Sequence, residues 1–239
     1  MQQRLKSLEE SVANLNRNLR RELVETNVTT EDLFDALTFL PIAFRREYQE
    51  SIKREMLQVK TFESIDPIFY FIVNPLTTFL DYKLLQHLIS KFGSSQLKQD
   101  MVEYVDDVEK FKDEITVAEL MDHWEGIEEK SINFSELQVH FGVDPTTCTL
   151  KELDDYRRRF CARYRLSEFV MILIYLKPPG SFIAVWRIPT ILIDELTGLI
   201  NQMDRTFFDE ENMTSISLAG EQIYPLLAHK DSNPGKYTM

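Results

Sequence analysis

The stretch that decides the fold is residues 137–189, LQVHFGVDPTTCTLKELDDYRRRFCARYRLSEFVMILIYLKPPGSFIAVWRIP. It begins with a strand pattern, because Leu137, Val139 and Phe141 alternate with polar residues. A strand buried on one face shows this alternation, since successive side chains point to opposite sides. The next residues, GVDPT, have the composition of a turn.

A helix follows the turn. Thr149 and Glu152 have the spacing of a capping box, in which each side chain binds the other residue's backbone N–H. Cys148 and Leu153 occupy the flanking hydrophobic staple positions. The expected buried face of this helix consists of Leu153, Tyr156, Phe160, Cys161 and Tyr164.

Two strands complete the stretch. Residues 169–176 are apolar throughout, which is typical of a strand covered on both faces. A tight turn at 177–180 leads to an alternating strand over 181–188, which Pro189 ends. We therefore predict a three-stranded β-α-β-β unit. Strand order stays open, because a crossover favours parallel neighbours and the final hairpin is antiparallel.

The residues before this unit have helical patterns. The predicted fold class is α+β, with a helix-rich N-terminal layer followed by the small three-stranded β-α-β-β unit. From residue 204 the sequence is polar and aperiodic, which predicts a disordered tail. The expected parts are a heptad-like helix at 1–28, a helical region at 29–130, the β-α-β-β unit with a closing helix at 131–203, and the tail at 204–239.

The first helix carries a narrow apolar seam. Its residues follow spacings of three and four, as in the a and d positions of a coiled coil: Leu5, Leu8, Val12, Leu15 and Leu19. Two heptads are marginal alone, so the helix must pack on its own chain or on a partner. We expect a homodimer with a dissociation constant in the micromolar range, and docking on the rest of the chain is the alternative.

Further helix signals follow in the N-terminal half. Thr29 or Thr30 should cap a helix, and an amphipathic helix should cover 43–59. Another helix should end at Gly93 with a left-handed residue. A long helix should bury the face formed by Leu97, Met101, Tyr104, Val105, Val108 and Phe111, and a capping box at Thr116 and Glu119 should begin the next helix.

The charge distribution limits the class of partner. The net charge is −12, which argues against nucleic acid, because affinity for a phosphate backbone rests on cationic contacts. Residues 100–130 hold twelve acidic residues and three lysines, a net charge of −9. This acidic segment is a solvated face or a docking surface for a basic partner. The basic patch Arg157–Arg159 binds an acidic group or offsets the chain's own acids.

Two features favour a cytoplasmic protein. The chain has only two cysteines, Cys148 and Cys161, which is no disulfide framework. The first residues are polar and lack the apolar core of a signal peptide. The longest apolar run, 68–80, is interrupted by Asn74 and Pro75 and is shorter than the roughly 20 residues of a membrane span. We expect no membrane span.

No residue pattern indicates catalysis, a cofactor or a metal ion. Cys148 and His140 are eight residues apart and match no nucleophile–base motif. The four histidines are scattered, whereas zinc requires several close ligands. The acidic pairs Asp106–Asp107 and Asp154–Asp155 are adjacent in sequence, so on a helix their side chains point in different directions. We interpret both pairs as part of a solvated helix face. We predict no catalytic, cofactor-binding or metal-binding residue.

Several segments resemble a known group of proteins. They are Leu40–Phe44, Asn74–Ile89, Phe92–Ser94, Tyr104–Phe111, Cys148–Leu153 and Gly180–Pro189. Together they resemble a domain of uncharacterised predicted proteins of early-branching animals, over roughly residues 30–190. That domain often accompanies death-fold or receptor-signalling modules, which implies an adaptor role. This chain departs from the multidomain members, because it has no separable death-fold module.

The sequence thus predicts a non-catalytic intracellular protein-interaction or adaptor module in signalling, with a protein partner of unknown identity. Two alternatives remain. One is an enzyme with a cleft between the helical and α+β parts. The other is a trafficking or scaffold protein that acts through its N-terminal helix.

Overall fold

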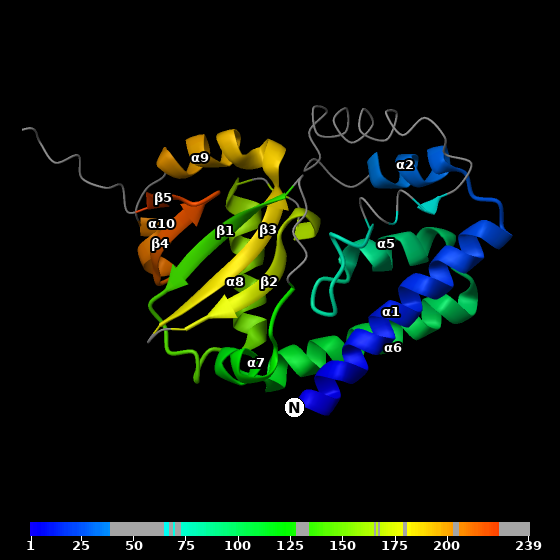
Figure 1. The fold of residues 1–239 in the computed structure, drawn as a ribbon, viewed down its shortest axis with the longest axis horizontal. Coiled ribbons are helices and arrows are strands. Elements are labelled where there is room, and N and C mark those ends of the chain that lie inside the picture. Colours follow the sequence, from blue (N-terminus) through cyan, green and yellow to red (C-terminus); the bar gives the residue numbers. More distant parts are fainter. Residues whose placement is uncertain are drawn as a thin grey trace, which may run out of the picture.

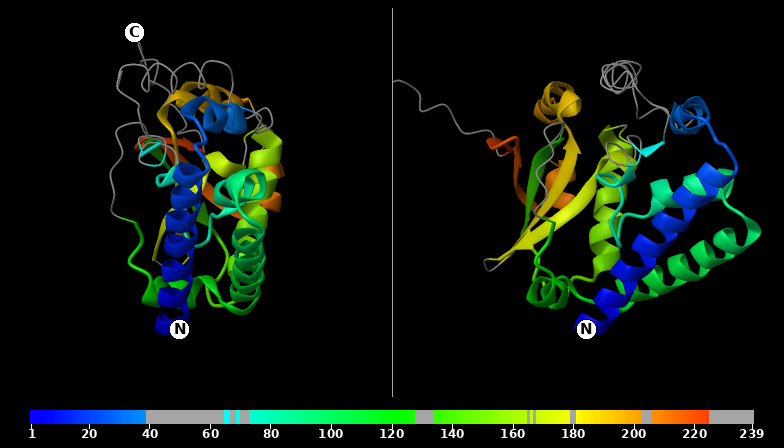
Figure 2. Two further views of the ribbon diagram at one scale, coloured as in Figure 1. Left: turned by 90° about the vertical axis from the view of Figure 1, so that its right-hand side faces the viewer. Right: turned by 45° about the vertical axis from the view of Figure 1, so that its right-hand side comes forward.

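The computed structural model describes residues 1–38, 65–66, 69, 73–127, 134–164, 166, 168–178, 181–202 and 206–224. It contains a helical layer and a sheet unit side by side, with the helix α8 between them (Figures 1 and 2). The α+β class is therefore confirmed. The expected helix over 43–59 lies outside the described residues.

The helical layer is built from amphipathic helices. Its described members are α1 (Gln2–Glu25), α2 (Thr30–Thr38), α5 (Lys83–Phe92), α6 (Ser95–Glu114) and α7 (Val117–His123). The long helices α1 and α6 run antiparallel (Figure 2). Polar contacts join both ends of this pair: Arg4 to Glu114 at 2.8 Å, and Glu22 to Ser94 at 2.8 Å.

The apolar seam of α1 faces its own chain. Its buried residues are Leu5, Leu8, Leu15, Leu19 and Leu23, while Val12 is half buried. This corrects the expectation of a homodimer through Leu5, Leu8, Val12, Leu15 and Leu19, because α5 and α6 already cover the face that a second copy would need. The alternative, docking on the rest of the chain, is confirmed.

Local capping explains several helix starts. Thr29 caps α2, because its hydroxyl accepts the backbone N–H of Asp32 at 3.1 Å. The capping box of Thr116 and Glu119 is complete. The left-handed residue expected at Gly93 is wrong: Gly93 is extended, with φ −71°. Glycine is needed there because a Cβ would lie 2.7 Å from the carbonyl oxygen of Ile89.

The sheet unit has five antiparallel strands in the order β2-β3-β1-β4-β5. Their bounds are β1 (Phe134–Phe141), β2 (Ile172–Lys177), β3 (Phe182–Pro189), β4 (Met213–Leu218) and β5 (Glu221–Tyr224). Because β3 pairs antiparallel with both β1 and β2, the strands β1 and β2 run in the same direction with β3 between them. The connection from β1 through α8 (Leu150–Tyr164) to β2 is therefore a split β-α-β crossover.

A second crossover places β1 at the centre. From β3 the chain passes through the short helix η3 (Thr190–Leu192), α9 (Ile193–Asn201) and α10 (Thr206–Glu210) to β4, on the other side of β1. The short helix η2 (Glu168–Val170) precedes β2, so only part of the expected strand over 169–176 is extended.

Part of the hydrophobic core lies between the sheet and α8. Leu137, Val139 and Phe141 are buried as their alternation predicts. Phe141 stacks on Phe182 of β3 at 5.0 Å and contacts Tyr156 of α8 at 4.9 Å, measured between ring centroids. Aromatic side chains of this size bury enough apolar area to dominate the stability of such a core.

The prediction of a disordered tail from residue 204 is wrong for residues 206–224, which form α10, β4 and β5. The predicted strand count of three was too low for the same reason. Each element is short, and serine and threonine interrupt the apolar residues of β4. The segment is ordered by tertiary contacts: β4 pairs with the central strand, and Phe208 stacks on Tyr224 at 4.2 Å. Residues 225–239 lie outside the described part.

The two capping boxes join the helical layer to the sheet unit. Their N-cap residues, Thr116 and Thr149, form an isolated antiparallel bridge. Next to it, Val117 donates its N–H to the Cys148 carbonyl at 2.8 Å, and Leu150 donates to the Ile115 carbonyl at 2.9 Å. The starts of α7 and α8 are therefore held together by backbone hydrogen bonds.

Candidate functional site

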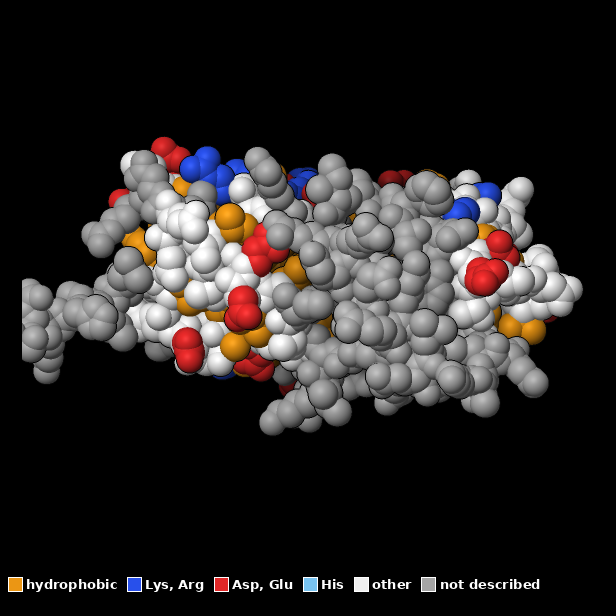
Figure 3. All heavy atoms as spheres, turned by 90° about the horizontal axis from the view of Figure 1, so that it is seen from above, with side chains coloured by type: hydrophobic (Ala, Val, Ile, Leu, Met, Phe, Trp, Pro, Cys, Tyr) orange, Lys and Arg blue, Asp and Glu red, His pale blue; other side chains and the backbone are white. Residues whose placement is uncertain are grey.

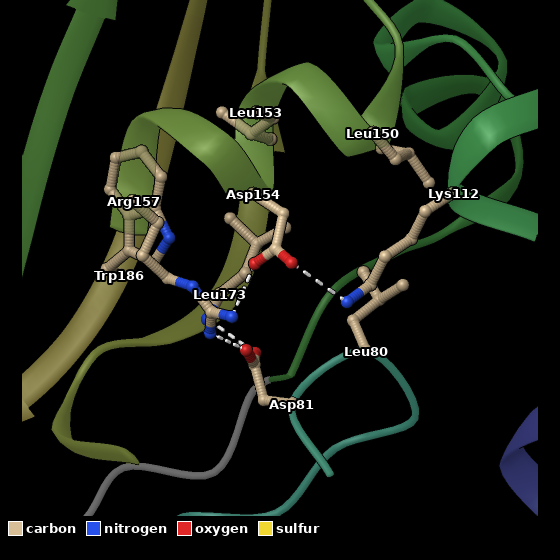
Figure 4. Close-up of a pocket in the computed structure, with 9 residues that line it drawn as sticks. All are labelled: Leu80, Asp81, Lys112, Leu150, Leu153, Asp154, Arg157, Leu173 and Trp186. Carbon is tan, nitrogen blue, oxygen red and sulfur yellow. Dashed lines mark hydrogen bonds and ion pairs between the residues drawn. The ribbon is translucent and has the colours of Figure 1, made fainter. Parts of the chain in front are cut away.

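The most unusual chemistry of the described residues lies between the helical layer and α8. Four charged side chains are buried there: Asp81 before α5, Lys112 on α6, and Asp154 and Arg157 on α8. We call this set the ionic junction, and Figure 4 shows its members pointing toward one another. Charged side chains are almost never fully buried unless they are paired, so their partners decide what the junction can do.

Helical spacing places three members of the junction. Lys112 lies one turn after the buried Val108, and Arg157 lies one turn after the buried Leu153. Asp154 is three residues before Arg157 and shares its face. Each of these charges occupies a position in the apolar stripe of its helix, where the other layer must cover it.

A tight turn places the fourth member. The Thr78 hydroxyl accepts the backbone N–H groups of Leu80 and Asp81, at 3.2 and 3.0 Å. This arrangement aims the Asp81 carboxylate at α8 and at the start of β2. There it accepts the backbone N–H of Leu173 at 2.9 Å.

Arg157 is the centre of the junction. Its guanidinium forms ion pairs with both Asp81 and Asp154 and donates to the Met171 carbonyl at 3.1 Å. Lys112 pairs with Asp154 at 3.1 Å. The two cations and two carboxylates neutralise one another, which is the condition for burying charge at a tolerable cost.

The junction continues toward the surface through partly exposed groups. Glu109 accepts from Lys112 at 3.2 Å and from the Tyr82 hydroxyl at 2.8 Å. Burial opposes the charge of Glu109, but Lys112 and the Tyr82 hydrogen bond outweigh it and lower the pKa of this carboxyl. Burial and the nearby Glu109 raise the pKa of Tyr82, which therefore stays a neutral donor.

A second branch runs from Asp154 to the exterior. Arg158 donates to Asp154 at 2.8 Å and lies 3.8 Å from Glu168, which also pairs with Lys83. Burial alone would raise the pKa of Glu168, but the hydrogen bond and charge of Lys83 lower it. This branch ties the start of α5 to η2, and each charge in it has a partner.

The open space at the junction is small. One cavity of about 20 Å³ is lined by Leu80, Leu150, Leu153, Leu173, Trp186 and the four members of the junction. A second, of about 10 Å³, lies on the side of Lys83 and Glu168. Pockets that bind small molecules measure about 300–1,000 Å³. These two cavities can take a water molecule or an ion and cannot take an organic substrate.

The basic patch Arg157–Arg159 divides among internal partners. Arg157 belongs to the junction, Arg158 pairs with Asp154 and Asp155, and Arg159 makes a bidentate contact with Glu211 at 2.5 and 2.8 Å. The interpretation that the patch offsets the chain's own acids is therefore confirmed. The interpretation of Asp154 as a solvated residue was wrong, because its side chain is only 7% exposed.

Asp81 and Lys112 were not among the residues predicted to form a site. For Lys112 a signal existed, because its position continues the buried stripe of α6. For Asp81 no local pattern was informative, because its partners Arg157 and Leu173 lie far away in the sequence.

Within α6, the acidic segment contributes side chains to the outer face of the helix. Glu103, Asp106 and Asp107 are exposed, and the last two make no ion pair within the described residues. Acidic side chains also reach the surface elsewhere. In the view from above, acidic and apolar side chains share the area over α9, where Asp194 is exposed (Figure 3).

Neither cysteine has the setting of a nucleophile. Cys148 and Leu153 are both buried, as the hydrophobic staple predicts. Burial and the nearby Glu152 raise the pKa of the Cys148 thiol to about 12. Burial likewise raises the pKa of Cys161 to about 12. A thiol with so high a pKa is protonated at neutral pH and reacts slowly.

The histidines do not converge on one site within the described part of the chain. His87 Nε2 lies 3.2 Å from the Ala36 carbonyl, His123 ends α7, and His140 is half buried on the outward face of β1. His229 lies outside the described residues. Among the residues with described positions, no group of three or more histidine, cysteine or acidic side chains is arranged to hold a metal ion.

No described helix is long and apolar enough to cross a membrane. Comparison of the chain with models of protein families, with curated proteins and with solved structures gave no match.

Proposed function

We propose that the protein is a non-catalytic protein-interaction module that binds a basic partner through the outer face of α6. The observation that carries the proposal is the closed ionic junction. An enzyme with a cleft between the helical layer and the sheet unit would need substrate space there. Among the described residues, paired charges and apolar side chains occupy the space at the ionic junction, and the two cavities there are of about 20 and 10 Å³.

The outer face of α6 has the chemistry of a docking surface. Asp106 and Asp107 are exposed and carry no counter-charge among the described residues. Beside them Val102 is 52% exposed, although most large apolar side chains with described positions are covered. Unpaired acids attract a basic partner over several ångströms and speed association, and an apolar contact adds affinity once the partner is in place.

The setting of this module is an adaptor role in intracellular signalling. The resemblance of roughly residues 30–190 to an uncharacterised domain that often accompanies death-fold or receptor-signalling modules supports this part of the proposal. The alternative of a scaffold protein acting through its N-terminal helix has less support, because the apolar seam of α1 is buried within the chain.

The proposal is tested by site-specific crosslinking of the full chain in cells. A photoreactive phenylalanine analogue replaces Val102, and crosslinked partners are identified by mass spectrometry. The full chain is required, because α1 and the strands β4 and β5 belong to the fold. We expect a partner with a basic segment that crosslinks at Val102 and is lost in the variant Asp106→Lys, Asp107→Lys.

A matched control separates the surface from the overall charge. The variant Glu210→Lys, Glu221→Lys makes the same change in net charge on exposed residues of α10 and β5. It should leave the crosslink intact. Equal loss in both variants, or the absence of a crosslink at Val102, contradicts the proposal.

A further inference from the structure

The larger cavity of the ionic junction is large enough for one water molecule. Counted as space open to the centre of a water molecule, it measures about 20 Å³. A cavity needs roughly 10–15 Å³ by this measure to hold one water. All the residues that line it are buried, and charged and apolar side chains share its wall (Figure 4).

Arg157 has spare hydrogen-bond donors. A guanidinium carries five N–H groups. Three of them are used, toward Asp81, Asp154 and the Met171 carbonyl. The buried Nε has no hydrogen-bond partner, and one N–H of the second terminal nitrogen is also left. A buried donor without a partner costs about 1–3 kcal/mol, so these groups favour a ligand that accepts hydrogen bonds.

The two carboxylates have spare acceptors. Each carboxylate oxygen can accept about two hydrogen bonds. Oδ2 of Asp81 accepts from Leu173 and Thr78, and Oδ2 of Asp154 accepts from Lys112 and Arg158. Oδ1 of each carboxylate accepts only from Arg157. One acceptor position is therefore left on each, which favours a ligand that donates two hydrogen bonds.

We infer that the ionic junction binds one water molecule, which donates to Asp81 and Asp154 and accepts from Arg157. Water supplies two donors together with acceptors, as this arrangement requires. A halide supplies no donor and would face both carboxylates. A monovalent cation supplies no acceptor and would face Arg157 and Lys112.

The charge of the junction also favours water over an ion. Asp81 and Asp154 balance Lys112 and Arg157, so the site is neutral before anything binds. A buried ion would add an uncompensated charge, which costs several kcal/mol. The bound water links Asp81 of the helical layer to α8 of the sheet unit. The second cavity, of about 10 Å³, is at the lower limit for a water molecule and carries no such inference.

The test is a crystal structure of the full chain, at a resolution that shows internal water, from crystals soaked separately in sodium bromide and rubidium chloride. We expect one density peak in the cavity, within hydrogen-bond distance of Asp81, Asp154 and Arg157, with no anomalous signal in either soak. An anomalous peak of bromide or rubidium in the cavity overturns the inference, and so does an empty cavity with ordered walls.

A measurement in solution gives an independent result. Oxygen-17 magnetic relaxation dispersion detects long-lived internal water. The substitution Leu150→Phe should fill the cavity and remove the contribution of about one water. The control Leu196→Phe changes a buried leucine of α9, away from the cavity, and should keep it. Equal amplitudes in wild type and Leu150→Phe overturn the inference. If Leu150→Phe does not fold, the crystal structure of the wild type decides.

Discussion

Replacing Arg157 by methionine tests whether the ionic junction holds the helical layer to the sheet unit. The side chain is 4% exposed and pairs with Asp81 and Asp154. Methionine keeps much of the length and the apolar stem but removes every donor. Asp81 then retains Leu173 N–H and Thr78, and Asp154 retains Lys112 and Arg158.

The expected loss follows from the charge left behind. Removing one partner of a buried ion pair costs about 3–5 kcal/mol, because the other charge stays buried without full compensation. The total free energy of unfolding of a protein is about 5–15 kcal/mol, so this is a large share. In a chain of 150–250 residues each kcal/mol shifts the melting temperature by about 2–4 °C, which gives a fall of about 6–20 °C.

Urea unfolding, followed by tryptophan fluorescence and by circular dichroism, measures this loss. The control Arg163→Met makes the same change on the same helix. Arg163 is exposed and lies 5.7 Å from the Phe207 ring, so its loss should cost at most about 1 kcal/mol. If the two substitutions shift the urea midpoint equally, the buried pairs do not contribute what the geometry implies.

Four further outcomes are expected. Trp186→Ala should cost about 3–5 kcal/mol, because its side chain is 2% exposed, and a nearly unchanged melting temperature would contradict the packing. Cys148 should resist maleimide in the native protein and react after denaturation, since burial raises its pKa to about 12, whereas fast native labelling would refute this. The pKa of Glu109 is lowered in the folded protein, so its carboxylate contributes fully to the free energy of unfolding above the unfolded pKa of about 4.3, and this contribution is lost as the pH falls. Glu109→Gln should therefore make the stability depend less on pH in the acid range, and an unchanged pH dependence would contradict this. The double substitution Leu8→Glu, Leu15→Glu should destabilise the chain equally at all protein concentrations. If light scattering shows that the mass of the wild type rises with concentration, the homodimer is supported instead.

Local patterns predicted the strand β1 and the helix α8 correctly. The alternation of Leu137, Val139 and Phe141 fixed which face is buried, because a strand has a period of two. The capping boxes at Thr116 and Thr149 fixed two helix starts, because their hydrogen bonds involve residues only three apart. Signals of this kind are complete within a few residues and need no knowledge of the fold.

The junction and the C-terminal strands could not be predicted in the same way. Arg157 lies in the apolar stripe of α8, but its partner Asp81 comes from a turn 76 residues away in the sequence. Serine and threonine make up half of the short strand β4, and the strand pairs with β1. In both cases the decisive contact is long-range, and a window of sequence does not contain it.

Asp81 explains why the junction is charged at all. A buried ion pair can often be replaced by apolar residues without loss of stability. Here the carboxylate of Asp81 also accepts the N–H of Leu173 on the outer edge of β2, and Ile127 donates to the carbonyl of Ile174 next to it, at 2.7 Å. An apolar side chain at position 81 would leave the Leu173 N–H buried without a partner, at a cost of about 1–3 kcal/mol. An unprotected strand edge also invites pairing with other chains. The carboxylate of Asp81 therefore satisfies an N–H on this edge of the sheet, and Arg157 neutralises that carboxylate where it is buried.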